Sequence, residues 1–160
     1  MQPAASLMVR SRGEFTEAVL SVLQATRHEL VLADRDFHDW PLETAAGAEA
    51  LSAFLVADTD ARLRLLVADP DWLERHGARF AVLRQRYRGA IECRRMPASL
   101  FDGAGAIIGD RRHLLRRAHH GQFRARLSLA DPGGVEPVAA RYDALWDEST
   151  HCLAATTLGL

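Results

Sequence analysis

The first half of the chain alternates between segments with helical and with strand-like hydrophobic spacing. Ser11 and Glu14 have the S-x-x-E spacing of a capping box, which marks the start of the first helix. Asp69 and Pro70 form a cap and first turn for a third helix, which runs in one or two pieces. Helices are predicted over residues 14–26, 48–55 and 72–87, and short buried strands over 29–33 and 61–68. This alternation predicts an α/β layered domain with a mixed, mainly parallel sheet flanked by helices.

The second half is richer in strand patterns. Strands are predicted over residues 90–95, 104–108, 113–115 and 122–130. Residues 109–112, Gly-Asp-Arg-Arg, are typical of a turn between hairpin strands. In the last strand the odd-numbered residues are apolar and the even-numbered ones polar, so Arg124 and Arg126 share a polar face. Asp131 and Pro132 repeat the cap arrangement and predict a final helix that ends near Trp146.

A chain of 160 residues matches one domain, which we expect over residues 14–149. Residues 1–13 are then an N-terminal extension and residues 150–160 a C-terminal tail. No apolar run is long enough to span a membrane and the N-terminus does not resemble a secretory signal, so we expect a cytoplasmic protein without membrane partners. Cys93 and Cys152 are far apart in the sequence and predict ordinary reduced thiols; no metal site and no cofactor are expected.

Charge is distributed unevenly along the chain. All 20 basic residues are arginines, because the sequence contains no lysine. Between residues 94 and 126 eight arginines face two acids, a local balance of +6 in a chain whose net charge is −1. One interpretation is a solvated surface in a protein whose codon usage favours arginine. The other is an electropositive face that binds anions, since guanidinium groups bind oxyanions at two points. Its candidate residues are Arg112, Arg116, Arg117, Arg124 and Arg126.

The order of these elements resembles a domain of the phospholipase D superfamily, over residues 14–149. Residues 107–110, Ile-Ile-Gly-Asp, resemble the end of its HxKxxxxD motif, with Asp110 as the motif aspartate. Residues 113–115 resemble the strand after the motif's turn, and residues 141–146 resemble the end of the terminal helix. The resemblance implies the layered α/β fold of that family. It also implies a homodimer, because single-copy members pair two motif copies.

The departures from the family pattern concern the catalytic residues. With Asp110 in place, the lysine position falls at Gly105 and the histidine position at Gly103, so both catalytic side chains are absent. His120 stands at the position of the family's asparagine. We therefore expect a degenerate, non-catalytic domain that binds a phosphorylated ligand, a nucleic acid or a protein partner through its arginine-rich face.

Two other functional hypotheses are compatible with the sequence. A divergent phosphodiesterase would use one of the clustered histidines with arginines as phosphate clamps, and its candidates are His113, His119 and His120. A purely structural homodimer would pair the basic and acidic faces of two copies.

A further candidate pocket is the loop after the first strand, where ligands of open α/β sheets often bind. Its polar residues include Asp34, Asp36, His38 and Asp39.

Overall fold

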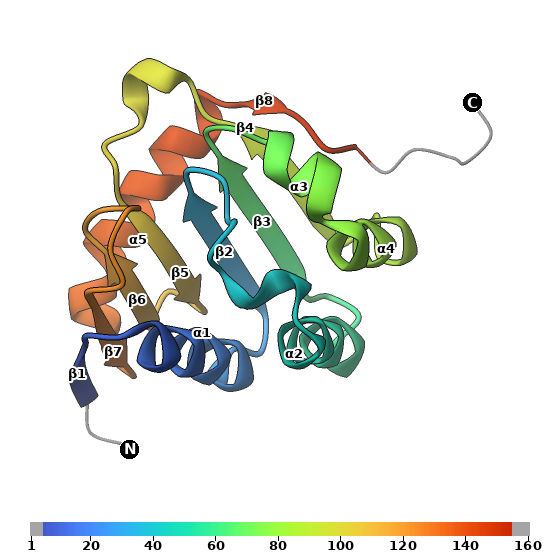
Figure 1. Cartoon of the computed structure of the whole chain (residues 1–160). Coiled ribbons are helices and arrows are strands. Elements are labelled where there is room, and N and C mark those ends of the chain that lie inside the picture. Colours follow the sequence, from blue (N-terminus) through green and yellow to red (C-terminus); the bar gives the residue numbers. More distant parts are fainter. Residues whose placement is uncertain (1–4, 155–160) are drawn as a thin grey trace.

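The elements join in one eight-stranded sheet with helices on both faces (Figure 1). This computed structural model describes residues 5–154. The strands are β1 (Ala5–Val9), β2 (Glu29–Asp34), β3 (Arg62–Val67), β4 (Ile91–Arg95), β5 (Gly105–Gly109), β6 (His113–Arg117), β7 (Ala125–Leu129) and β8 (Thr150–His151). The helices are α1 (Arg12–Ala25), α2 (Ala45–Ala57), α3 (Asp71–His76), α4 (Ala78–Arg86) and α5 (Pro132–Asp147), with 3₁₀ turns at Pro41–Glu43 and Ala98–Leu100.

The sheet order is β1-β7-β6-β5-β2-β3-β4-β8, which confirms the α/β class and the mixed sheet. Only β2 with β3 and β3 with β4 pair in parallel, so the expectation of a mainly parallel sheet is wrong. The reason is that β5, β6 and β7 follow one another without crossover helices and must pair as antiparallel neighbours. Both edge strands, β1 and β8, are antiparallel as well.

The edge strands come from the ends of the chain. β1 belongs to the segment expected as an N-terminal extension, and it pairs with β7 along its whole length. β8 opens the segment expected as a C-terminal tail and pairs with β4. Residues 1–4 of that extension and residues 155–160 of that tail lie outside the described residues.

Two of the three caps predicted from the sequence start their helices. The Ser11 side chain accepts a hydrogen bond from the Glu14 N–H at 3.1 Å, and Asp131 accepts one from the Gly134 N–H at 3.1 Å. The third differs, because α3 begins at Asp71 with Pro70 as its N-cap residue, and Asp69 accepts a hydrogen bond from the Asp71 N–H at 3.1 Å. The predicted third helix is divided in two at Gly77, where α3 ends and α4 begins. None of the helices among residues 5–154 is long and apolar enough to cross a membrane.

Two apolar clusters lie on opposite faces of the sheet, as the alternation of strand side chains requires. On one face α1, α2, α3 and α4 pack over the larger cluster, which includes Phe15, Leu32, Leu65 and Phe80. On the other face α5 alone covers the smaller cluster, around Trp146 (Figure 1). One helix cannot cover eight strands, so parts of this face stay open on both sides of α5.

The turn between β5 and β6 also fixes the start of β2. Asp110 and Arg111 have φ values of 51° and 54°, so both adopt the left-handed conformation in the three-residue turn, 110–112, between β5 and β6. The carboxylate of Asp110 accepts backbone hydrogen bonds from Arg27, His28 and Glu29 at 2.7, 2.8 and 2.9 Å. Burial acts to raise the pKa of Asp110, but these three N–H groups outweigh it and hold the pKa below its ordinary value. Asp110 therefore has a structural role, at the join of α1, β2 and the hairpin.

Replacing Asp110 by alanine should lower the free energy of unfolding by about 2–4 kcal/mol, because three N–H donors lose a charged acceptor. Urea unfolding at pH 7 measures the change. Asp147→Ala, at the exposed end of α5, is the matched control and should stay within about 0.5 kcal/mol of the parent.

The same substitution has a pH signature. A depressed carboxyl pKa contributes stability above its unfolded value, and this contribution is lost as the pH falls through the folded pKa. The deficit of Asp110→Ala should therefore be full at pH 6 and should shrink below pH 3.8, the ordinary value of the carboxyl. A deficit that is the same at pH 6 and pH 3 would show that the carboxylate charge contributes nothing.

Candidate functional site

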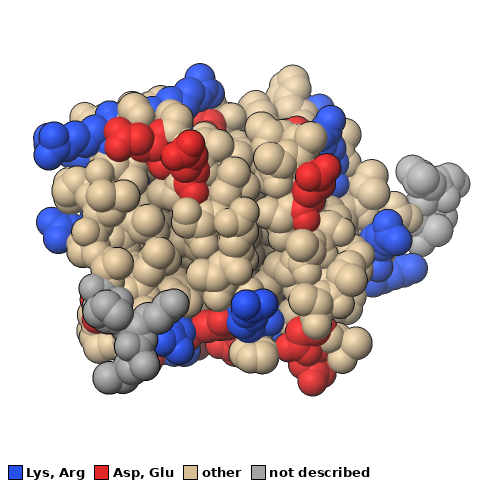
Figure 2. Space-filling model, turned by 90° about the horizontal axis from the view of Figure 1, so that it is seen from below, with Lys and Arg blue, Asp and Glu red and all other residues tan. Residues whose placement is uncertain are grey.

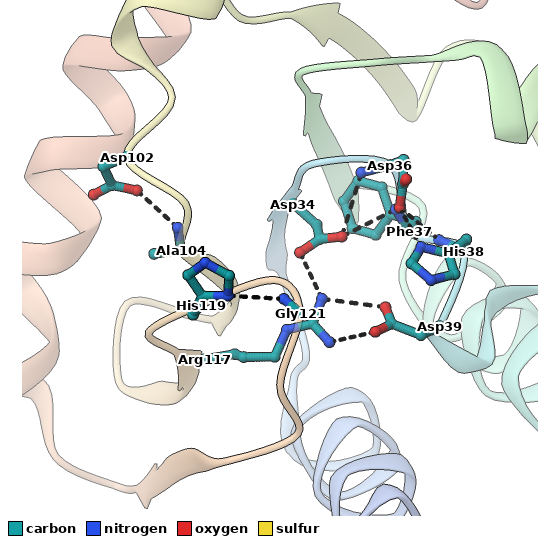
Figure 3. Close-up of polar contacts among 10 residues, drawn as sticks. All are labelled: Asp34, Asp36, Phe37, His38, Asp39, Asp102, Ala104, Arg117, His119 and Gly121. Carbon is teal, nitrogen blue, oxygen red and sulfur yellow. Dashed lines mark hydrogen bonds and ion pairs between the residues drawn. The ribbon is translucent and has the colours of Figure 1, made fainter.

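A buried ion cluster joins the carboxyl ends of β2 and β6 (Figure 3). The Arg117 guanidinium donates to Asp34 from Nη2 at 2.9 Å and to Asp39 from Nη1 and Nη2 at 2.6 and 3.1 Å. The side chains of Arg117 and Asp34 are 1% and 0% exposed, and that of Asp39 is 8% exposed. The guanidinium carbon also lies 5.0 Å from the ring centre of Phe15, on α1. We call Asp34, Asp39 and Arg117 the buried ion cluster.

The cluster has two carboxylates for one guanidinium. Burial acts to lower the pKa of Arg117, but Asp39 and then Asp34 outweigh it and raise the pKa above its ordinary value. Arg117 is therefore permanently charged. Because three charges sum to a net negative one, the cluster repels anions.

The loop after β2 folds around the same aspartate. Asp34 Oδ2 accepts from the N–H groups of Asp36 and Phe37 at 3.3 and 3.0 Å, while Oδ1 binds Arg117. Phe37 has a φ of 63° and is fully buried. At the surface, His38 Nδ1 and Asp36 Oδ1 lie 2.7 Å apart and form a hydrogen bond. Both carboxylate oxygens of Asp34 thus bind groups of the protein, whereas the side chains of Asp36 and His38 reach solvent.

Gly105 and Gly103, which the phospholipase D resemblance assigns to the lysine and histidine positions, lie near this cluster. Gly105 lies opposite Arg117 in the β5–β6 ladder, and Gly103 accepts a hydrogen bond from the His120 N–H at 2.8 Å. A Cβ atom at Gly105 would lie 2.5 Å from Asp34 Oδ1, a distance that side chains do not adopt. Asp34, on the neighbouring strand, therefore occupies the space that a side chain at residue 105 would need.

The three candidate histidines separate. His113 lies at the start of β6, whereas His119 and His120 follow the other end of this strand. The length of the strand, about 13 Å, separates the two positions. His113 is buried, and its Nδ1 accepts from the Ala130 N–H at 3.0 Å. Burial, and then Arg112, lower the pKa of His113 and favour this neutral, accepting ring. The sequence cluster therefore does not converge on one site.

His119 and His120 lie beside the ion cluster. Their rings stack with centres 4.7 Å apart, and Phe101 lies 5.7 Å from His120. His119 Nδ1 accepts from the Gly121 N–H at 3.1 Å (Figure 3). Burial, and then Arg35, lower the pKa of His120. No group of three or more metal-ligating side chains occurs among residues 5–154.

The predicted anion-binding arginines also divide into different environments. Arg117 is in the buried ion cluster, and exposed Arg112 adjoins the turn at the other end of β6. Arg116, Arg124 and Arg126 line a cavity of about 290 Å³ together with Met8, Leu114, Ala118, Ala125 and Ser128. We call this the basic groove. Within residues 5–154 no carboxylate lies within 4.0 Å of its three guanidinium groups.

The sequence pattern of β6 predicts that Arg116 and Arg117 lie in different environments. Leu115 and Arg117 are two residues apart in one strand and must share one face of the sheet, whereas Arg116 lies on the opposite face, which α5 covers only in part. The contribution of Met8 has no such signal, because the sequence predicts residues 1–13 as an extension and does not predict β1.

Replacing Arg117 by methionine should lower the free energy of unfolding by about 3–5 kcal/mol, because two buried carboxylates lose their partner. Urea unfolding measures the loss. Adding Asp34→Asn to Arg117→Met should recover part of it, since one of the two uncompensated charges is removed.

Arg126→Met is the matched control, an exposed arginine on the adjacent strand, and should change stability by less than about 0.5 kcal/mol. Equal losses in Arg117→Met and Arg126→Met would mean that the buried pairing does not hold the fold together.

Comparison with known proteins places the fold. TrmBL2, an archaeal chromatin protein with a mode of DNA binding called novel, superposes with a TM-score of 0.69 at 16% identity, over 92% of this chain and 54% of that one. Nuc from Salmonella typhimurium, a phospholipase D family member, superposes with a TM-score of 0.69 at 12% identity, over 94% of this chain and 99% of that one. NucT from Helicobacter pylori superposes with a TM-score of 0.64 at 9% identity, over 94% of this chain and 100% of that one.

At these identities the likeness concerns the fold alone, and the fold is phospholipase D-like. This chain spans about half the length of the TrmBL2 chain. The comparison with curated proteins gave no match. Residues 11–158 match the family described as "Domain of unknown function (DUF7931)", and because this match covers most of the sequence, the chain belongs to that family.

Proposed function

We propose that this chain is a non-catalytic phospholipase D-like domain that binds a polyanion, a nucleic-acid backbone, in its basic groove. The observation that carries the proposal is the pairing of two arginines. Arg116 lies directly opposite Arg126 in the β6–β7 ladder, on a part of the sheet face that α5 leaves open. Like charges at directly opposed positions destabilise a sheet. An anion bound between them removes this repulsion.

The composition of the groove suits a phosphate chain. Arg124 lies two residues from Arg126 and so shares its face, which places three guanidinium groups around one concavity. Guanidinium groups bind phosphate oxygens at two points and stay charged at every physiological pH. Positive charge does not spread over the whole molecule. On the face in Figure 2, basic and acidic side chains lie near one another around the margin and the middle is uncharged.

The residues at the positions of the phospholipase D motif support the non-catalytic part of the proposal. A phosphodiesterase needs positive groups that hold the phosphoryl oxygens and a histidine that attacks phosphorus. Here the buried ion cluster carries a net negative charge, and Asp34 occupies the space of a side chain at residue 105. Anion binding therefore belongs to the outer face of β6 and β7.

One structural neighbour adds support from outside the chain. TrmBL2 is a chromatin protein that binds DNA, and its chain contains this fold over about half of its length. A phospholipase D-like fold is thus compatible with nucleic-acid binding in a protein whose role is chromatin structure.

Polyanion binding should be weak and salt-dependent, because each arginine that contacts a phosphate releases about one counterion. Three contacts predict a loss of roughly one and a half decades of affinity between 50 and 200 mM salt. Fluorescence anisotropy with a labelled single-stranded oligonucleotide measures this. Arg124→Ala with Arg126→Ala should reduce the loss to about half a decade.

The control is Arg75→Ala with Arg79→Ala, which removes two exposed arginines of α3 and α4 and so the same net charge. It should leave the salt dependence close to that of the parent. Equal effects of both double variants would assign binding to net charge. No binding at 50 mM salt would overturn the proposal.

Hydrolysis is the second test. The purified protein should not cleave bis(p-nitrophenyl) phosphate or plasmid DNA, with or without divalent metal, because the motif histidine and lysine positions are glycines. Colorimetric and gel assays measure this. Turnover that disappears in His119→Ala or His120→Ala, but persists in the more distant His113→Ala, would establish a divergent phosphodiesterase instead.

A further inference from the structure

The two cysteines, 59 positions apart in the sequence, meet across the β4–β8 edge of the sheet. Arg94 lies opposite His151 and Arg95 opposite Thr150 in this antiparallel ladder. One step further along the same register places Cys93 opposite Cys152. The Cys152 N–H donates to the Cys93 carbonyl oxygen at 3.1 Å, which shows that the ladder continues to this pair.

This position has the geometry of a disulfide site. Directly opposed residues of an antiparallel pair point to the same face, and their Cα atoms are about 5.5 Å apart where they are hydrogen-bonded. Disulfides form between Cα atoms roughly 4.4–6.8 Å apart. Both side chains pack into the same apolar cluster. They are free thiols in this structure.

We propose that Cys93 and Cys152 are a redox pair that closes into a cross-strand disulfide and fastens β8 to the edge of the sheet. A small disulfide such as glutathione disulfide is the oxidant. Cys152, the less buried of the two, attacks it as a thiolate and releases one glutathione. The Cys93 thiolate then attacks the Cys152 sulfur and releases the second glutathione. The protein loses two protons and two electrons, and the glutathione disulfide gains them.

The surroundings permit this exchange and set its rate. A cavity of about 250 Å³ adjoins the pair and is lined by Arg84, Arg88 and His151 among others, which gives a small oxidant access. Burial raises the pKa of Cys93 to about 12 and that of Cys152 to about 11, and Arg84 partly offsets both shifts. Few thiolates therefore exist at pH 7, so oxidation is slow there and rises about tenfold per pH unit toward pH 9.

The experiment compares the full chain after reduction with the same chain after incubation with glutathione disulfide at pH 8.5. The expected product is a monomer on a non-reducing gel, lighter than the reduced chain by two hydrogen atoms in intact mass. Trypsin cleaves after Arg88, Arg94 and Arg141, so peptide 89–94 should be linked to peptide 142–160. The melting temperature should rise by roughly 10 °C, because the disulfide closes a long loop.

Cys152→Ser is the matched control and should leave Cys93 unlinked, with no rise in melting temperature. Because wild-type chains in two redox states already test the proposal, a failure of this variant to fold would not remove the test. Two thiols still titratable in denaturant after oxidation, stable mixed disulfides with glutathione, or disulfide-linked dimers would each overturn the proposal. None of these outcomes bears on the basic groove, so the two proposals fail separately.

Discussion

A guanidinium held between two carboxylates away from water determines how this fold closes. Arg117 ends β6, Asp34 ends β2, and Asp39 belongs to the loop that follows β2, so two segments distant in sequence meet at one charge. A buried ion pair is seldom more stable than well-packed apolar residues, but its geometry is directional and each missing partner is costly. The cluster therefore fixes the position of the loop over Phe15 and the alignment of β6 with the rest of the sheet.

The same arrangement explains the glycines at residues 103 and 105. Gly105 and Gly103 leave room at the start of β5, and Asp34 and the His119–His120 segment use it. A Cβ atom at residue 105 would lie 2.5 Å from Asp34 Oδ1, so a larger residue there would displace the carboxylate that binds Arg117.

Sequence patterns predicted the elements that depend on local chemistry. The capping Ser11, the Asp131-Pro132 helix start and the turn at residues 109–112 were all found, because each is decided within a few residues. Sequence patterns did not predict the features that depend on contacts between residues distant in the sequence. The antiparallel edges depend on which strands become neighbours, and the meeting of Cys93 with Cys152 depends on β8 pairing with β4. The burial of Arg117 depends on two aspartates that precede it by 83 and 78 residues.

The period of two along β6 connects the buried cluster to the surface. Arg116 and Arg117 are consecutive, so they must lie on opposite faces of the sheet. A slip of one residue would exchange the faces of Arg116 and Arg117, and would also move Leu115 to the other face. The ion cluster therefore favours the register that places Arg116 opposite Arg126 on the face of α5. The repulsion between these two arginines is a local destabilisation that the buried pairing and the apolar core outweigh. The concentration of positive charge in the basic groove is thus a consequence of the strand register that the buried ion cluster favours.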